Sequence, residues 1–299
     1  MALQNDINYL YRWSIENKMN FHPKKCKVVS VANRRPPLLG ILPNIQYFYC
    51  LGDTILDYAD SEKDLGVDIN TNLNFSEQCE RLHSKANQQF GLTKRICHFV
   101  NDIKRKRALY LSLIRSQFEH CSPIWRPTNN TMIDKLENFQ KKCIKWILSE
   151  ESRHYSTPEI YVRKCRQTRL LPLNKRFEFN DLVLFYKVIY KLIPLQLPAY
   201  LKFFDGVSSL RSCHLDTLSI ISDIRPKNNH ITTTNKNCAL NKSFFYRTHL
   251  LWNNLPYEIR CIRHYPKFRT ELLKLLWKSI VTDDDMISDD EFSDLVDNG

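Results

Sequence analysis

Glycine is scarce in this chain, with 6 residues among 299. A low glycine content together with long amphipathic runs is typical of a mostly helical protein. The chain also lacks the nucleotide-binding motifs G-x-x-x-x-G-K-S/T and G-x-G-x-x-G, the G-x-S-x-G motif of serine hydrolases and the H-E-x-x-H motif of zinc proteases. The sequence therefore carries none of the short signatures by which those enzyme classes are recognised.

Paired metal-ligand spacings are missing among the ten cysteines, none of which forms a C-x2-C or C-x4-C motif. Several of them fall where a helix would place apolar residues: Cys79, Cys97, Cys121 and Cys143. Because the sequence shows no signal peptide, we expect an intracellular protein, nuclear or cytoplasmic and not secreted, with thiols rather than disulfides. The pairs His120-Cys121 and Cys213-His214 would need distant partners to hold zinc, so we predict no metal site.

A membrane-spanning segment is also missing. The most apolar stretch, 182–197, contains Lys187, Lys191 and Pro194. Each lysine near the middle of a bilayer would cost about 2.5–3.5 kcal/mol. We interpret this stretch as a helix of the protein core and expect no membrane partner.

Positive charge is abundant and unevenly distributed. The net charge is +12, but residues 283–297 hold eight acids and no base. The remaining 24 acids face 44 basic residues, which gives +20 over residues 1–282. Such a basic body suits a polyanion, with nucleic acid as the first candidate, although a merely soluble basic protein is the alternative. The segment 283–299 is interpreted as an acidic disordered tail.

The first part of the chain combines one helix with short strands. An amphipathic pattern predicts a helix over 3–18, and alternation with β-branched residues predicts a strand at 26–31. Residues 46–50 and 54–56 indicate a hairpin, and 65–69 indicate another strand. We expect one small antiparallel sheet packed on one helix.

Helical spacing dominates from Phe75 onward. Apolar residues at intervals of three and four predict helices over 75–93, 103–121 and 131–148, which would form a bundle. A capped helix start at Thr157-Pro158-Glu159 begins the next region.

Two further long helices are predicted at 173–192 and 266–280, separated by a polar stretch over 205–241 that we interpret as a long loop, with room for short strands. The predicted fold is mainly α with a small antiparallel β-sheet (α+β). The predicted division is 1–72, 73–150, 151–282 and the tail 283–299.

Four sequence segments, in this order, carry a family resemblance. They are LQNDINYLYRWSIENKMNF with the later KDLGV, RALYLSLIRSQFEHCSPIWRP, LENFQKKCIKWI and SFFYRTHLLWNNLPYEIR. Together they resemble the downstream half of the reverse transcriptase of non-long-terminal-repeat (LINE, jockey-like) retrotransposons, over about residues 3–280. The resemblance implies that 1–72 is the edge of a polymerase palm, 73–150 a helical thumb and 151–282 a helical C-terminal domain.

The resemblance also implies that the catalytic centre is missing. The family's Tyr/Phe-Ala-Asp-Asp hairpin, whose aspartates hold Mg²⁺ in the complete enzyme, should lie shortly upstream of Leu3, where only two residues stand. Tyr58-Ala59-Asp60 imitates this motif, but Ser61 replaces the second aspartate. We therefore predict no catalytic residue and no cofactor in this chain.

What the resemblance carries over is the handling of nucleic acid. Lys24 and Lys25 match a position near the incoming triphosphate. The strand containing Lys63, Leu65 and Gly66 matches the primer grip, which steadies the end of the primer.

Basic residues in the thumb-like region are predicted to contact the duplex. The predicted residues are Lys104, Arg105, Lys106, Arg107, Lys141 and Lys142, with Lys145 adding positive charge nearby. Cations at the start of a helix oppose its dipole, and a phosphate partner would relieve that cost. A solvated basic helix start, or a nuclear address, is the alternative for 104–107.

The sequence thus predicts a reverse-transcriptase fragment that binds a template–primer (RNA–DNA or DNA) duplex without polymerase activity of its own. One alternative is a domesticated protein-interaction module, and another is a truncated gene model of a full polymerase. We further expect self-association through an open palm edge formed by 26–31 and 65–69.

Overall fold

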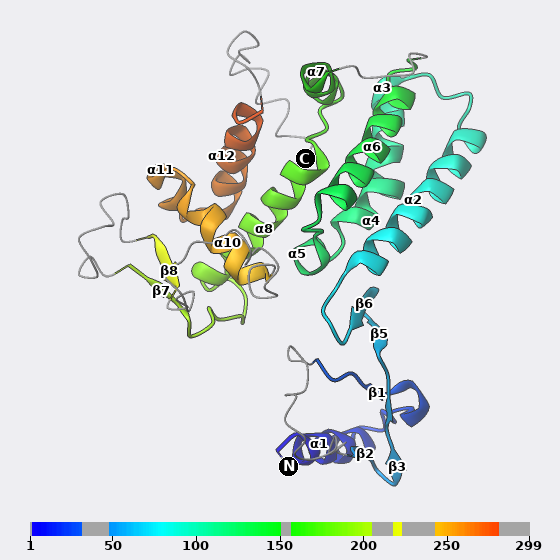
Figure 1. The fold of residues 1–299 in the computed structure, drawn as a ribbon, viewed down its shortest axis with the longest axis vertical. Coiled ribbons are helices and arrows are strands. Elements are labelled where there is room, and N and C mark those ends of the chain that lie inside the picture. The colour runs from blue at the N-terminus through cyan, green and yellow to red at the C-terminus, as the bar shows by residue number, and fades with distance from the viewer. Residues whose placement is uncertain (1, 32–47, 151–156, 205–217, 223–242, 281–299) are drawn as a thin grey trace, which may run out of the picture. The chain divides into compact units, whose positions relative to one another are not determined.

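The computed structural model describes residues 2–31, 48–150, 157–204, 218–222 and 243–280 (Figure 1). The acidic segment 283–299 and most of the predicted loop 205–241 lie outside these residues. Helices dominate the described chain, and its strands form small two-stranded sheets, which confirms the predicted fold class. The chain divides into two compact units, 1–78 and 79–299, with the boundary inside helix α2.

The first unit begins with α1 (Ala2–Glu16), which packs on the hairpin of β2 (Cys50–Leu51) and β3 (Thr54–Ile55). The side chain of Gln4 makes two hydrogen bonds with the backbone of Cys50. Its Nε2 donates to the carbonyl oxygen at 2.9 Å, and its Oε1 accepts from the amide at 2.9 Å. The side-chain amide of Gln4 thus makes the pair of hydrogen bonds that the backbone of a neighbouring strand would make with Cys50.

The turn of this hairpin requires glycine. Gly52 has a φ of +61°, which side chains with a Cβ rarely adopt. A Cβ at this position would also lie 2.6 Å from Cζ of Tyr11 on α1. Helix and hairpin therefore approach closely because this residue has no side chain.

The remaining strands of the first unit differ from the predicted single antiparallel sheet. β1 (Lys27–Val28) pairs in parallel with β4 (Asp57–Tyr58), and β5 (Ser61–Asp64) pairs antiparallel with β6 (Val67–Asn70). The expected strand through Leu65 and Gly66 is wrong, because both residues have positive φ (45° and 90°) and form the two-residue turn between β5 and β6. Turns of this kind close hairpins. The predicted sheet of 26–31 with 65–69 is wrong as well, since β1 pairs with β4 and β6 pairs with β5.

The second unit contains the helices predicted between 75 and 148, with one correction. The elements are α2 (Ser76–Ile96), α3 (Ile103–Tyr110), the π-helix η2 (Leu111–Arg115), α4 (Ser116–Glu119), α5 (Ser122–Trp125) and α6 (Asn130–Ile147). The helix expected over 103–121 is confirmed from Ile103 to Glu119, but it widens into the π-helical turn η2 on the way. It ends two residues earlier than predicted, before Cys121, which has a φ of 51°.

Aromatic side chains fill the space between these helices. The Phe139 ring on α6 makes edge-to-face contacts with Phe90 of α2 and Phe118 of α4, at centroid distances of 6.0 and 5.6 Å. Trp125 of α5 contacts Phe177 at 5.6 Å in the same manner. α2, α4 and α6 therefore meet around Phe139, and α5 packs on a residue further along the chain.

The rest of the second unit is helical with one short sheet. The elements are α7 (Pro158–Thr168), α8 (Leu173–Ile189), β7 (Leu201–Phe203), β8 (Ile220–Ser222), α10 (Phe244–Asn253), α11 (Tyr257–Arg260) and α12 (Tyr265–Lys278). The predicted cap is confirmed, since the Thr157 hydroxyl accepts a hydrogen bond from the Ile160 amide. β8 lies inside the polar stretch that we interpreted as a loop and pairs antiparallel with β7.

A buried polar network connects helices on both sides of residue 150. The Tyr110 hydroxyl donates to Oε1 of Gln140 at 2.8 Å. Nε2 of Gln140 donates to the Tyr161 hydroxyl and to the Leu171 carbonyl, and Tyr161 donates to Glu137 at 2.6 Å. Burial raises the pKa of both tyrosines well above the ordinary value, so they act as neutral donors.

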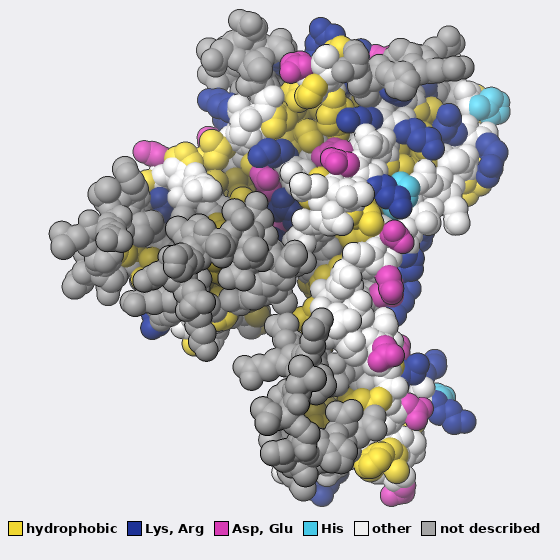
Figure 2. Space-filling view, viewed as in Figure 1, with side chains coloured by type: hydrophobic (Ala, Val, Ile, Leu, Met, Phe, Trp, Pro, Cys, Tyr) yellow, Lys and Arg dark blue, Asp and Glu magenta, His cyan; other side chains and the backbone are white. Residues whose placement is uncertain are grey.

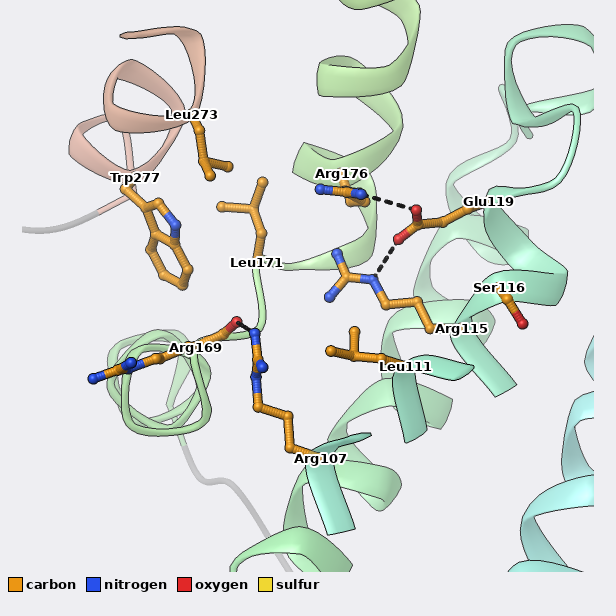
Figure 3. A pocket seen from close by; sticks show the side chains of 10 residues that line it. All are labelled: Arg107, Leu111, Arg115, Ser116, Glu119, Arg169, Leu171, Arg176, Leu273 and Trp277. Atoms are coloured by element: carbon orange, nitrogen blue, oxygen red, sulfur yellow. Dashed lines mark hydrogen bonds and ion pairs between the residues drawn. The ribbon is translucent and has the colours of Figure 1, made fainter. Parts of the chain in front are cut away.

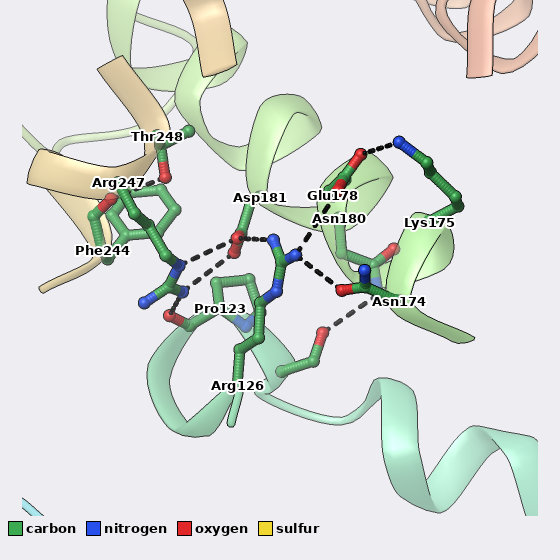
Figure 4. A network of polar contacts seen from close by, with 11 residues as sticks. Pro123, Arg126, Asn174, Lys175, Glu178, Asn180, Asp181, Phe244, Arg247 and Thr248 are labelled. Atoms are coloured by element: carbon green, nitrogen blue, oxygen red, sulfur yellow. Dashed lines mark hydrogen bonds and ion pairs between the residues drawn. The ribbon is translucent and has the colours of Figure 1, made fainter. Parts of the chain in front are cut away.

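A second network centres on Asp181, which has no exposed surface (Figure 4). Its carboxylate binds Arg126 at 2.8 Å and Arg247 at 2.9 and 3.0 Å. Arg247 also donates to the carbonyl oxygen of Pro123. The carboxylate of Asp181 thus links α8 with the end of α5 and with α10. The domain boundary predicted at residue 150 falls inside the second unit.

Candidate nucleic-acid interface

Two lysines from different helices lie over one phenylalanine ring on the outer side of the second unit. Nζ of Lys94 on α2 is 5.7 Å from the centroid of the Phe90 ring, and Nζ of Lys142 on α6 is 5.5 Å from it. Lys142 also donates to Oδ1 of Asn87 at 3.4 Å. Cations over an aromatic face are attracted by its negative quadrupole, which helps to hold two like charges side by side.

The start of α3 brings two more cations to the same end of the helices. Lys104 and Arg105 are exposed there, and the carboxylate of Asp102 caps the helix by accepting from the Arg105 amide at 3.1 Å. An anionic cap offsets part of the cost of placing cations at a helix N-terminus. The helix dipole alone therefore does not demand a phosphate at this position.

Lys106 serves a different purpose from its neighbours. Its side chain is 5% exposed, and Nζ donates to the carbonyl oxygen of Trp146 at 3.2 Å and to the Ser149 hydroxyl at 2.7 Å. These two hydrogen bonds hold the start of α3 against the end of α6. The contacts of Lys106 are internal, so we leave it out of the candidate interface.

These elements together carry six cations that we call the basic surface. Its residues are Lys94, Arg95, Lys104, Arg105, Lys142 and Lys145. Figure 2 shows Lys and Arg side chains gathered over the upper ends of α2, α3 and α6. A cluster of cations on adjoining helix ends raises the local potential for a polyanion.

His83 lies further along the junction of α2 and α6. Its ring contacts Phe139 edge to face at 5.7 Å. Burial lowers the pKa of His83, and the nearby charges of Lys135 and Lys142 lower it further. The imidazole is therefore neutral at pH 7 and adds no charge to the surface.

The structure separates other residues that the sequence had grouped together. Lys141 points to α7, where its Nζ is 5.1 Å from the centroid of the Tyr161 ring. Arg107 lines a cavity and donates to the Arg169 carbonyl at 3.3 Å. Of the six predicted thumb cations, Lys104, Arg105 and Lys142 thus belong to the basic surface.

Two cations of the basic surface, Lys94 and Arg95, were not predicted. They form the last turn of α2, where cations favour the helix dipole. Lys94 follows Phe90 by four residues, and this spacing places both on one helix face. The spacing of Phe90 and Lys94 could therefore have predicted this contact from the sequence.

The first unit holds the remaining predicted site residues. Lys24 and Lys25 are exposed in η1 (Pro23–Lys25), and Lys63 is exposed in β5. Leu65 is 84% exposed at the tip of the hairpin beside Gly66. The segment that the resemblance matches to the primer grip therefore forms the end of β5 and a protruding turn.

Metal ligands do not converge anywhere in the described residues, where no group of three or more His, Cys, Asp or Glu side chains forms a site. Sγ of Cys121 lies 3.5 Å from Nε2 of His120, and the pair Cys213-His214 lies outside the described residues. The cysteines that the structure describes are free thiols, and burial raises the pKa of Cys79 to about 12. In the described ranges, no helix is both long and apolar enough to cross a membrane.

Comparisons with family models, with curated proteins and with solved structures find no match to this chain.

Proposed function

We propose that this chain is derived from a non-long-terminal-repeat reverse transcriptase and binds the phosphate backbone of a template–primer duplex through its basic surface. The observation that supports the proposal best is the convergence of α2, α3 and α6. Lys94 and Lys142 share one aromatic ring, and Lys104 and Arg105 start the helix that is fastened beside them. The segment that holds these residues is the one that the family resemblance assigns to the thumb.

The physical argument rests on charge and preorganisation. Phosphates spaced along a duplex release their condensed counterions when lysine or arginine replaces them, and this release drives binding. Phe90 and Asn87 hold Lys142 in place before any ligand arrives, so less side-chain entropy is lost on binding.

The test is the salt dependence of duplex binding. Fluorescence anisotropy with a labelled RNA–DNA hybrid would compare the wild type with the double variant Lys94→Glu/Lys142→Glu. The slope of log K against log salt should flatten by about 1.8, at about 0.9 for each phosphate that the variant no longer neutralises. Lys267→Glu is the matched control, because Lys267 is an exposed lysine on α12, away from the basic surface, and it should leave the slope unchanged.

Equal slopes for the wild type and the double variant would overturn the proposal. A DNA duplex measured beside the hybrid tells whether the binding is selective for one nucleic acid. Phosphate contacts alone carry no sequence information, so we expect no preference among base sequences.

The proposed chain has no polymerase activity of its own. Nucleotide transfer by two metal ions needs carboxylates that converge on both ions. Asp60 lies between β4 and β5 with Ser61 beginning the next strand, and no group of three or more metal-binding side chains forms among the described residues. Primer extension with magnesium or manganese should be absent, and incorporation that disappears with Asp60→Ala would contradict this.

A protein-binding module is the second candidate, and α1 gives it a specific observation. Leu3, Tyr9, Leu10 and Trp13 of this helix are all more than two-fifths exposed. Exposed apolar groups of this size are typical of surfaces that meet another protein. Binding to a protein partner that is insensitive to salt, together with no affinity for duplex, would favour this function.

A further inference from the structure

The turn between α2 and α3 exposes three large apolar side chains beside the basic surface. Ile96 ends α2 and is 60% exposed, and Ile103 begins α3 and is 40% exposed. Phe99 lies in the turn between them and is 70% exposed. We call these three residues the apolar tip. Large apolar groups that gather on a surface are typical of a contact with a partner.

The turn that carries Phe99 is short and hydrogen-bonded. The Cys97 amide donates to the carbonyl oxygen of Thr93 at 2.9 Å, and the Val100 amide donates to the carbonyl oxygen of Cys97 at 3.1 Å. The ring of His98 contacts the Phe99 ring edge to face at a centroid distance of 5.7 Å. Phe99 is thus presented on an ordered turn, so less conformational entropy is lost when its ring binds a partner.

Cations lie on both sides of the apolar tip. Lys94 and Arg95 precede it in the last turn of α2. Lys104 and Arg105 follow it in the first turn of α3, and all four side chains are exposed. Asp102 is the acid of this stretch, and its carboxylate caps α3 and lies 3.9 Å from Nε of Arg105. Four bases and one acid give the stretch a formal net charge of +3.

The next two bases of α3 contact other parts of the fold. Lys106 is bonded to the end of α6. Arg107 lines a cavity together with Arg169 and Trp277 (Figure 3). The run 104–107 is therefore divided into an outer pair beside the apolar tip and an inner pair that packs against neighbouring elements.

An exposed aromatic ring among exposed cations is the combination by which proteins bind single-stranded nucleic acid. The ring stacks on an unpaired base, and lysine and arginine meet the neighbouring phosphates. Bases inside a duplex are already stacked on each other, and taking one out of the stack costs free energy. The Phe99 ring is therefore suited to a base that has no partner strand.

We propose that Phe99 stacks on an unpaired base that adjoins the duplex, so that the chain prefers a duplex with a single-stranded extension to a blunt one. This proposal rests on the proposed function, since the basic surface holds the duplex beside the apolar tip. Charge decides the kind of partner. A nucleic-acid strand offers a negative phosphate and an apolar base face at every nucleotide, which matches the four cations and the ring between them.

The test compares three labelled RNA–DNA hybrids by fluorescence anisotropy with the full chain. One hybrid is blunt, and in the second the longer strand extends unpaired beyond both ends. The third has the same extensions built from abasic nucleotides, which keep the phosphates and lack the bases. The wild type should bind the extensions with bases at least about fivefold more tightly than the abasic ones. Phe99→Ala should bind the two equally, and Phe99→Trp should restore the preference, because indole also stacks on bases.

Phe48→Ala is the matched control. Phe48 is a phenylalanine of the first unit that is 70% exposed, as Phe99 is, so its removal should leave the preference for bases unchanged. Phe99→Ala should also leave the salt slope of the blunt hybrid unchanged, because stacking releases no counterions. Circular dichroism verifies that each variant is folded.

This proposal and the proposed function fail in different ways. Equal binding of the two extended hybrids by the wild type, or a preference that Phe99→Ala keeps, would overturn the stacking contact. The salt slope of Lys94→Glu/Lys142→Glu on the blunt hybrid decides the phosphate contact separately. If that slope equals the wild-type slope while the preference for bases depends on Phe99, the phosphate contact is wrong and the stacking contact stands.

An anionic lipid surface is the other partner that meets apolar groups flanked by cations. Vesicles of phosphatidylserine and phosphatidylcholine test it by sedimentation with the wild type and Phe99→Ala. Sedimentation that depends on Phe99, together with equal binding of the two extended hybrids, would overturn the stacking proposal in favour of a lipid contact. No sedimentation of the wild type, together with the preference for bases, supports the unpaired base.

Discussion

Asp181 is a fully buried carboxylate that holds two arginines from distant parts of the chain. Arg126 comes from the end of α5 and Arg247 from α10, and both lie within 3.0 Å of its oxygens. Arg126 is also bound by Oδ1 of Asn174 at 2.9 Å. Arg126 also lies 3.7 Å from Glu178, so Asp181 is the buried carboxylate that the two arginines share.

Asp181→Ala should therefore lower the free energy of unfolding by about 3–5 kcal/mol, because it removes the fully buried carboxylate that pairs with both guanidinium groups. Asp134→Ala removes an exposed carboxylate from α6 and should change stability by less than about 0.5 kcal/mol. Urea denaturation of the two variants measures the difference. Equal losses of stability would show that the network contributes nothing specific.

Glu119 gives the stability of the second unit a dependence on pH. Burial alone would raise its pKa, but the charges and hydrogen bonds of Arg115 and Arg176 lower it below the ordinary value of 4.5. Because the folded pKa is the lower one, the carboxylate stabilises the fold above pH 4.5, and this stabilisation is lost as the pH falls through the folded pKa.

The prediction is a stability difference between the wild type and Glu119→Gln that changes with pH. The wild type should be the more stable at pH 7, and its advantage should shrink as the pH falls below 4.5. Denaturant titrations of both proteins across this range measure the advantage at each pH. An advantage that stays constant would mean that Glu119 does not titrate with a lowered pKa.

At the level of single residues, the sequence could not tell Lys106 from Lys104. Four basic residues in a row look alike, and their roles are decided by the helix that packs against them. Lys106 faces the end of α6, whereas Lys104 faces solvent. Information of this kind is tertiary, so no local pattern contains it.

Elements were predictable where a period was sustained. Helices α2, α6 and α8 begin and end within a few residues of the predicted bounds, because their apolar residues repeat over several turns. The π-helical turn η2 and the short helix α5 were not predicted, because the apolar spacing continues through both of them. The turn at Leu65 and Gly66 was missed because leucine rarely adopts positive φ.

The contribution of Lys106 to stability and that of Lys104 to duplex binding can be measured separately. Lys106→Ala removes two hydrogen bonds from a buried ammonium group and should lower the free energy of unfolding by about 1.5–3 kcal/mol. It should leave the salt slope of duplex binding unchanged. Lys104→Ala should do the reverse, with stability within about 0.5 kcal/mol of the wild type and a slope flatter by about 0.9.

Measuring both variants by urea denaturation and by anisotropy decides the assignment. If Lys106→Ala is as stable as the wild type, the hydrogen bonds of Lys106 to the end of α6 do not stabilise the fold. A Lys104→Ala protein with an unchanged slope would place Lys104 outside the contact with phosphates.

On the scale of the whole molecule, charge was predictable and arrangement was not. Net charge and the distribution of acids can be counted in the sequence, and they suggested a polyanion before any fold was known. The sequence did not reveal that helices on both sides of residue 150 share Gln140 and Asp181 as polar centres. Those contacts join residues more than 30 positions apart, where periodicity gives no guidance.

The acidic segment 283–299 is the last feature with a testable consequence for the whole chain, although it lies outside the described residues. Its eight acids reduce a body of charge +20 to a net +12. An anionic segment tethered to a basic protein competes with phosphates by Coulomb attraction, which salt screens over about 10 Å at 0.1 M. The alternative is that the segment only increases solubility and binds nothing.

Deleting 283–299 should tighten duplex binding at low salt, and the gain should shrink as salt is added, because screening weakens the competitor and the ligand together. A chain of full length with the eight acids replaced by their amides is the matched control, since it removes the charge and keeps the length. If competition by charge is the cause, both proteins should gain affinity equally in anisotropy titrations with the RNA–DNA hybrid. A gain in the deletion alone would point to bulk rather than charge, and unchanged affinity in both at low ionic strength would show that the acids do not act on the basic surface.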